Sequence, residues 1–319
     1  MNACRASRRR SNRIRSRLVN AGPAFTAFGT ALRSDLDLAD YLPAASPAGS
    51  ARTIDVRQAA TPPLAPAFRW PFAVTHGRQL TAASDQAFRG ATTGQRWWLE
   101  VEDTATFHWT VGQSTLAYAP GPEAHDAALA FWLIHSVLPS FLALEGSYHF
   151  LHAAAATLAG GAVLLVGPSG SGKSTLLSAL LDRGGELVSD DKVAIREQNG
   201  RFHAVPSHPR FRPYRRHEDL GRPAPAVAGG PVPLGVLLRL QPTEPTADIR
   251  FRPIRGADKL RAISNQLLFG FSDSAPTHFA FLARLLDRAP LFELRAPRDL
   301  ARLDELGDAI IHRFAPTCP

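Results

Sequence analysis

One loop constrains this chain more than any other stretch. Residues 162–177 read AVLLVGPSGSGKSTLL, an apolar run followed by a glycine-rich loop and the start of a helical pattern. The loop fits G-x-x-x-x-G-K-[ST] in the strand-to-helix context that this motif requires. Its glycines let backbone N–H groups face phosphate oxygens, its lysine neutralises phosphate charge, and its last hydroxyl can ligate Mg²⁺. The sequence therefore predicts an α/β fold that binds a nucleoside triphosphate on a P-loop.

The predicted phosphate-binding residues form one continuous segment: Gly167, Pro168, Ser169, Gly170, Ser171, Gly172, Lys173, Ser174 and Thr175. A P-loop alone does not separate ATPases, GTPases, transporter motors and kinases. The chain carries no Asn/Thr-Lys-x-Asp motif for guanine, since GADKL (256–260) does not fit it, and no LSGGQ-like signature. These absences argue against a guanine-specific protein and against a transporter motor.

Two adjacent aspartates follow the loop closely. Asp190 lies 17 positions after Lys173, which leaves room for one helix, one tight turn and one short strand. In a parallel α/β sheet the carboxyl end of that strand faces the same crevice as the loop. One carboxylate can then accept the proton of an attacking hydroxyl while Asp191 holds Mg²⁺ or orients a neighbour. The competing interpretation is a solvated Asp-Asp turn between two hairpin strands.

Histidine and arginine side chains supply further candidates. His152 lies in the apolar strand that precedes the loop strand, where it is either a hydrogen-bonded core residue or a member of the site. The segment VPSHPRFRPYRRH (205–217) contains four arginines. Arg210 and Arg212 are candidates for binding the transferred phosphate or an acceptor carboxylate, because guanidinium groups bind such anions bidentately. The alternative is a solvated surface loop.

The stretch LHAAAATLAGGAVLLVGPSGSGKSTLLSALLDRGGELVSDDKVAI (151–195) resembles the core of the HPr serine kinase/phosphorylase family. The shared features are a histidine in the strand ahead, the P-loop, a short helix, and an Asp-Asp pair followed by an apolar strand. The resemblance implies a P-loop core related to that of phosphoenolpyruvate carboxykinase. It also implies Mg-ATP as phosphate donor and a serine hydroxyl as acceptor.

The same resemblance assigns roles to individual residues. It implies that Lys173 and Ser174 bind phosphate and metal, and that Asp190 is the catalytic base. Asp191 then supports this base and shares the metal, and His152 lies beside the reacting groups. These are expectations for the geometry of the site.

The remainder of the chain departs from that family. The downstream Glu/Arg-Gly signature and the Pro-Gly-Arg loop are missing, so the reverse phosphorylase reaction has no sequence support. Residues 231–306 instead look like the shorter HPr-kinase-like proteins associated with ribosomally made peptides. Some of those resemble kinases that act on a serine near the C-terminus of a lasso-peptide precursor. The expected partner is therefore a peptide or small protein, and the oligomeric state stays open.

The net charge of +8 comes from one end of the chain. Residues 1–34 contain eight arginines and no acidic residue, which leaves the rest neutral and predicts no general nucleic-acid binding. We interpret this end as a basic disordered tail or an over-long start, with an acidic partner and an organelle-targeting peptide as alternatives. Cys4 and Cys318 offer neither a disulfide framework nor a metal-ligand spacing, which favours a reducing cytoplasm.

Four segments follow from composition and periodicity: a tail (1–34), an Ala/Pro/Ser-rich linker (35–66), a small antiparallel β-rich domain (67–146) and the P-loop kinase domain (147–319). The apolar run 127–144 just reaches the length of a membrane span, about 18 residues. His135, Ser136, Pro139 and Ser140 interrupt it, and it leads into a nucleotide-binding pattern. We therefore expect a buried helix and no membrane span.

Three functions remain open at this stage. The first is an ATP-dependent serine kinase acting on a peptide or small protein. The second is a kinase for a small sugar, alcohol or amine. The third is a nucleotide-dependent regulatory module with little catalysis, in which the β-rich region docks a partner. The presence of Lys173, Asp190 and Asp191 favours an enzyme over the third.

Overall fold

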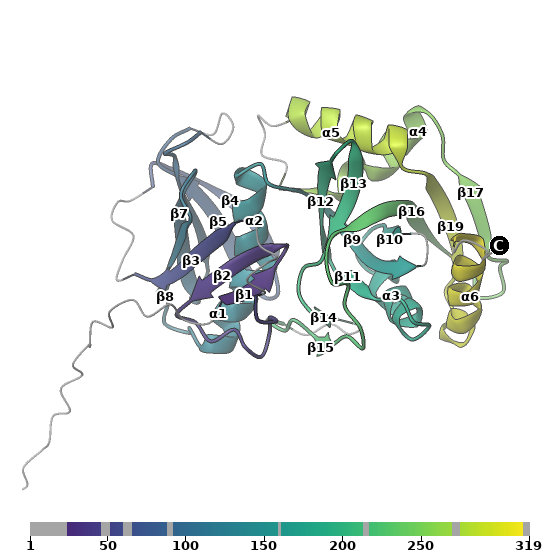
Figure 1. Ribbon diagram of the computed structural model, residues 1–319, viewed down its shortest axis with the longest axis horizontal. Coiled ribbons are helices and arrows are strands. Elements are labelled where there is room, and N and C mark those ends of the chain that lie inside the picture. Colours follow the sequence, from purple (N-terminus) through teal and green to yellow (C-terminus); the bar gives the residue numbers. More distant parts are fainter. Residues whose placement is uncertain are drawn as a thin grey trace, which may run out of the picture.

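The structure, a computed structural model, describes residues 24–45, 52–59, 66–87, 92–158, 161–212, 217–269 and 275–314. Two large β-sheets lie side by side with a long helix between them (Figure 1). The first sheet belongs to the N-terminal part of the chain and the second carries the P-loop. The fold is an α/β P-loop fold with a β-rich N-terminal region, as the sequence predicts.

In the part of the chain that the structure describes, the N-terminal sheet has eight strands in the order β1-β2-β3-β8-β7-β6-β5-β4. Their bounds are β1 Ala24–Ala27, β2 Thr30–Ser34, β3 Thr53–Gln58, β4 Phe68–Thr75, β5 Arg78–Ser84, β6 Arg96–Val101, β7 Ala105–Thr110 and β8 Thr115–Pro120. Strands β4 to β8 form an antiparallel meander, whereas β3 runs parallel to both β2 and β8. The sheet is therefore mixed rather than purely antiparallel.

Two predicted boundaries are wrong in this region. Residues 24–34, assigned to the basic tail, form β1 and β2, and residues 53–58, assigned to the linker, form β3. Strands β1 and β3 bury alternate side chains, among them Phe25, Ile54 and Val56, which is how a strand with one core face behaves, and β2 buries four of its five residues. The surrounding Ala, Pro and Ser hide this short alternation in the sequence. Residues 1–23 of the predicted tail lie outside the described residues.

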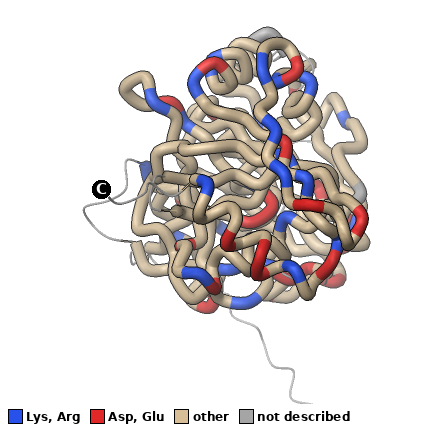
Figure 2. Tube along the Cα trace, turned by 90° about the vertical axis from the view of Figure 1, so that its right-hand side faces the viewer, with Lys and Arg blue, Asp and Glu red and all other residues tan. Residues whose placement is uncertain are grey.

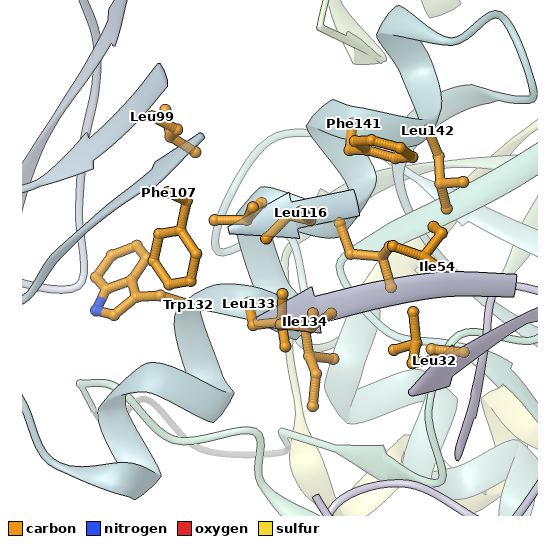
Figure 3. Close-up of a cluster of buried hydrophobic side chains, with 14 of the residues drawn as sticks. Leu32, Ile54, Leu99, Phe107, Leu116, Trp132, Leu133, Ile134, Phe141 and Leu142 are labelled. Carbon is orange, nitrogen blue, oxygen red and sulfur yellow. The ribbon is translucent and has the colours of Figure 1, made fainter. Parts of the chain in front are cut away.

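A single helical rod, Asp126–Leu144, joins the two sheets. It consists of α1 (Asp126–Trp132), a π-helical turn (Leu133–Val137) and α2 (Leu138–Leu144). It is long and apolar enough to cross a membrane, with a mean hydropathy of 1.8, but 89% of its apolar 18-residue window is buried inside the protein. Figure 3 shows Leu133 and Ile134 packed among apolar side chains of the N-terminal sheet. The prediction of a buried helix is confirmed.

The second sheet contains nine strands among the described residues. Their bounds are β9 His149–Leu158, β10 Gly161–Val166, β11 Leu187–Ser189, β12 Lys192–Gln198, β13 Arg201–Val205, β16 Val232–Thr243, β17 Arg250–Pro253, β18 Leu267–Leu268 and β19 Leu291–Pro297. β9 is antiparallel to both β10 and β11, whereas β10 is parallel to β16. The sheet is thus mixed, not parallel as assumed from the sequence. β10 and β11 still point the same way, because both run against β9.

Helices cover both faces of this sheet. Alternate residues of β10 belong to two different cores: Leu164 packs with α4 (Ala257–Ile263) and α5 (Ala275–Arg288), and Leu165 packs with α3 (Lys173–Leu181) and α6 (Leu303–Phe314). Helix α4 ends at Ile263, and soon after it Leu267 and Leu268 pair with β9. Short elements complete the fold: η2 Ser264–Gln266, η4 Leu300–Arg302, β14 Arg210–Phe211 and β15 Arg222–Pro223.

Basic and acidic residues are interspersed along the chain in the view of Figure 2. The charge pattern of the described part therefore agrees with a neutral body, as the composition outside the tail indicates. The expectation of no nucleic-acid partner remains a prediction.

Candidate functional site

A pocket of about 980 Å³ lies between the two sheets. One part of its lining, here called the P-loop side, consists of the loop residues 169, 170 and 172–175, His152 and residues 190–192. The other part, here called the hairpin side, comes from the β4–β5 hairpin, His135, Ser136, Arg212, His217 and residues 267–269. The pocket thus brings together residues that are almost 200 positions apart in the chain.

The P-loop leaves β10 and enters α3 at Gly172, whose φ of 96° lies in the left-handed region that favours glycine. Lys173 is almost fully buried, and its Nζ donates to the carbonyl oxygens of Gly167 (2.8 Å) and Pro168 (3.0 Å). The same Nζ lies 3.0 Å from Nε2 of His152. A lysine ammonium only donates, so this Nε2 accepts and the proton of His152 is on Nδ1.

Asp190 closes the P-loop side against Ser174. Its Oδ1 accepts a hydrogen bond from the Ser174 hydroxyl at 2.9 Å, and its Oδ2 accepts from the backbone N–H of Arg212 at 2.8 Å. Burial raises the pKa of Asp190 above its ordinary value, and these two hydrogen bonds oppose that effect only in part. Both oxygens of Asp190 are therefore engaged beside the loop hydroxyl that ends the motif.

Asp191 lies two residues after the end of β11 and adopts a left-handed backbone conformation, with φ of 75°. This turn separates its carboxylate from that of Asp190 and directs it toward two histidines. Nδ1 of His152 lies 3.3 Å from Oδ1 of Asp191, and Nζ of Lys192 lies 2.9 Å from Oδ2. Although burial alone would raise the pKa of Asp191, the Lys192 charge and the hydrogen bond from His152 hold it well below its ordinary value. Asp191 is therefore ionised at neutral pH.

His135 enters the pocket from the π-helical turn. Pro139 has no N–H to donate to the carbonyl four residues earlier, and the helix widens just before it. The His135 Nε2 lies 2.8 Å from Nζ of Lys192 and 3.1 Å from Oδ2 of Asp191. Burial, followed by the nearby Lys192 charge, holds the pKa of His135 well below its ordinary value, so its ring is neutral.

The two arginines predicted from the sequence behave differently. Arg212 lines the pocket, and its guanidinium lies 3.7 Å from Oδ2 of Asp191. Arg210 instead donates to the backbone carbonyls of Asp40 and Gly221 and lies over the ring of Tyr41. The other two arginines of that segment, at 215 and 216, lie outside the described residues.

One pocket is thus lined by Lys173, Ser174, Asp190, Asp191, His152 and Arg212, whereas Arg210 lies outside it. Sequence reasoning did not identify His76, His135, Lys192 or His217. Two signals were present: Lys192 directly follows the aspartate pair, and His135 interrupts an otherwise apolar run. For His76 and His217 no local pattern exists, because the fold alone brings them to the pocket.

The residues of the P-loop side suit a magnesium nucleotide. The Ser174 hydroxyl and the Asp190 carboxylate offer hard oxygen atoms beside the loop, which is the donor chemistry that Mg²⁺ prefers. Within the described ranges, no group of three or more His, Cys, Asp or Glu side chains could hold a metal ion. This agrees with a metal held mainly by nucleotide phosphates and water, and not with an all-protein cage.

Comparisons with known proteins add the following. Residues 142–182 match a family model described as the P-loop containing region of an AAA domain. That match spans the β9–β10 hairpin, the loop and α3, so it shows a nucleotide-binding P-loop region and extends no further. No curated protein matches the sequence.

Among solved structures, the chain is similar to the Hpr(Ser) kinase/phosphatase from Coxiella burnetii at 15% identity and a TM-score of 0.31. The similarity covers 51% of this chain and 95% of that one. A TM-score this low carries no argument about shared fold or function. The fold assignment therefore rests on the sheet topology and the P-loop themselves.

Proposed function

We propose that this protein transfers the γ-phosphate of Mg-ATP to a serine hydroxyl of a peptide or small protein. The observation that carries this proposal is the division of the pocket. A P-loop with Lys173 and Ser174 occupies one side, and an ionised carboxylate, Asp191, faces the shared space between that loop and a second wall. An enzyme that only hydrolysed nucleotide would not need the second, mixed polar and apolar wall.

The proposed reaction is a displacement at phosphorus. The acceptor oxygen forms a bond to the γ-phosphorus, the bond to the β–γ bridging oxygen breaks, and ADP leaves. The hydroxyl proton passes to the carboxylate of Asp191, which is ionised at neutral pH and can accept it in the transition state. When bound, Mg²⁺ supplies charge neutralisation on the phosphates. Lys173 leaves the carbonyls of its own loop to bind the phosphates.

The structure supports a different division of labour between the aspartates from the one inferred from sequence. It is Asp190, and not Asp191, that accepts the hydrogen bond of Ser174, so we assign Asp190 to the metal side of the reaction. Asp191 is linked through His152 to Lys173 and faces the pocket, so we assign it as base. His152 then orients Asp191 through its Nδ1–H. The left-handed turn at Asp191 is what sends the two carboxylates to these different places.

The acceptor class rests on the resemblance of residues 151–195 to HPr kinases and on the finer likeness to kinases of lasso-peptide precursors. We propose a serine near the C-terminus of such a precursor as the acceptor. A small sugar, alcohol or amine remains the competing acceptor, because a pocket of this volume also falls in the range of small-molecule sites, about 300–1,000 Å³.

Labelled Mg-ATP, offered with a serine peptide library and in parallel with a metabolite set, tests the proposal. We expect labelled phosphoserine, and Asp191→Asn should lower kcat by about 10²- to 10⁴-fold with nucleotide affinity retained. Asp190→Asn should instead weaken Mg²⁺-dependent nucleotide binding. Undiminished transfer by Asp191→Asn would refute the assignment of the base. Label in a metabolite, or nucleotide binding without any transfer, would refute the peptide-kinase proposal.

A further inference from the structure

Arg212 connects the two sheets at the pocket. Its backbone N–H donates to Asp190 on the P-loop side, whereas its guanidinium lies 3.1 Å from Nε2 of His76 and 3.2 Å from Nε2 of His135. An arginine only donates, so both imidazole nitrogens accept and neither offsets its charge. Asp191 lies farther from Arg212 than from Lys192, at 3.7 Å against 2.9 Å. The guanidinium therefore keeps positive charge for a further anion.

The β4–β5 hairpin of the N-terminal sheet contacts both Arg212 and Glu218. His76 occupies the turn with a left-handed φ of 50°, and its ring packs edge-on against Phe131 at 4.9 Å between centroids. Two residues on, Arg78 pairs with Glu218 at 3.2 Å, and Glu218 also accepts from the indole N–H of Trp132 at 2.8 Å. The hairpin thus fixes the position from which Arg212 reaches the pocket.

The same hairpin supplies an apolar wall. Phe72 of β4 stacks on Phe269 with ring planes 9° apart and centroids 6.0 Å apart, so an aromatic pair joins the two sheets at the pocket. Leu80 of β5 and Leu268 of β18 also line it. A cationic group beside an apolar wall is the pattern that binds an anionic group attached to an apolar one.

We propose that Arg212, positioned by His76, binds a carboxylate of the acceptor, with an apolar acceptor side chain against Phe72 and Phe269. This inference rests on the proposed function and extends it to the acceptor. Arg212 lies beside the carboxylate of Asp191, next to His135 and Lys192. Lys173, on the P-loop side, is linked to Asp191 through His152. A carboxylate on Arg212 consequently places a hydroxyl of the same residue next to Asp191. The N-terminal sheet is then part of the acceptor site and not only a scaffold.

Two synthetic peptides test this subsite by equilibrium binding without nucleotide: Ala-Gly-Ala-Leu-Ser as the free acid and as the C-terminal amide. We expect the wild type to bind the acid at least about tenfold tighter, as a charge-assisted hydrogen bond implies. Arg212→Lys and His76→Ala should lose this preference. His76→Gln, which keeps an acceptor for Arg212, should retain most of it. His312→Ala, on the exposed face of α6, is the matched control and should behave as wild type.

Each remaining outcome has a defined meaning. No acid preference in the wild type, whether both peptides bind or neither does, overturns the inference. Weaker Mg-ADP binding by Arg212→Lys with unchanged peptide preference would assign the arginine to the nucleotide and overturn it as well. Binding needs no turnover, so a failure to find labelled phosphoserine would sink the kinase proposal while leaving an acid preference in place. Urea unfolding of every variant separates loss of folding from loss of binding.

Discussion

The P-loop side of the pocket comes from residues 152–192, a continuous part of the chain whose motif and spacing are visible in the sequence. The hairpin side is collected from β4, β5, the helical rod and the segment around Arg212, and it exists only because the N-terminal sheet packs against the second sheet. Under the proposed function, phosphate binding therefore depends on local backbone geometry, whereas acceptor binding depends on long-range packing. The two sides should respond differently to mutation.

The largest effect on stability is expected for a residue of the packed core that supports the hairpin side. Leu133 is fully buried in the rod that joins the sheets, so Leu133→Ala should lower the free energy of unfolding by ~2–5 kcal/mol. Urea denaturation measures this loss. At urea concentrations below the unfolding midpoint of this variant, we expect the affinity for the peptide to fall at lower urea than the affinity for Mg-ADP. A loss under about 1 kcal/mol, or equal weakening of both ligands, would mean that the two sides are not separable in this way.

The two aspartates sharpen the comparison through pH. The folded-state pKa of Asp191 lies below its ordinary value of 3.8, so its stabilising contribution is present above 3.8 and is lost as the pH falls through the folded pKa. The pKa of Asp190 is raised, so its contribution is present below 3.8 and is lost as the pH rises through the folded pKa.

Urea midpoints as a function of pH check these signs. Asp191→Asn should flatten the decline in stability on the acid side of 3.8, whereas Asp190→Asn should flatten the decline on the other side. Parallel curves for the two variants would contradict the opposite environments assigned to the two carboxylates.

The smallest effect is expected from Arg210. It lies two residues before Arg212, but it contacts backbone carbonyls and Tyr41 outside the pocket. Arg210→Ala should cost about 1 kcal/mol of stability from lost hydrogen bonds and leave the KM for the acceptor within about twofold of wild type. A KM as strongly raised as that of Arg212→Lys would show that the segment acts as a whole and not through one guanidinium.

How much the sequence predicts differs between the sides for physical reasons. The P-loop, helix α3 and the aspartate pair can be predicted from residues close in the chain, because glycine conformation and strand-helix alternation are local properties. The different contacts of Asp190 and Asp191 do not follow from local sequence. They depend on a left-handed turn at a non-glycine residue, which the surrounding structure imposes. His76 approaches Arg212 across 136 positions, and no sequence period encodes that contact. The strands at 24–34 and 53–58 were missed because each is short and lies in low-complexity surroundings.

Measuring the binding of two ligands to two variants tests the central claim that the two sides of the pocket bind two different substrates. Calorimetry gives the Kd of Mg-ADP and of the free-acid peptide for Lys173→Ala and for His76→Ala. We expect Lys173→Ala to weaken Mg-ADP by about 10- to 100-fold and to leave the peptide within about twofold, and His76→Ala to do the reverse. Both variants weakening the same ligand would contradict the account, because the pocket would then be a single nucleotide site.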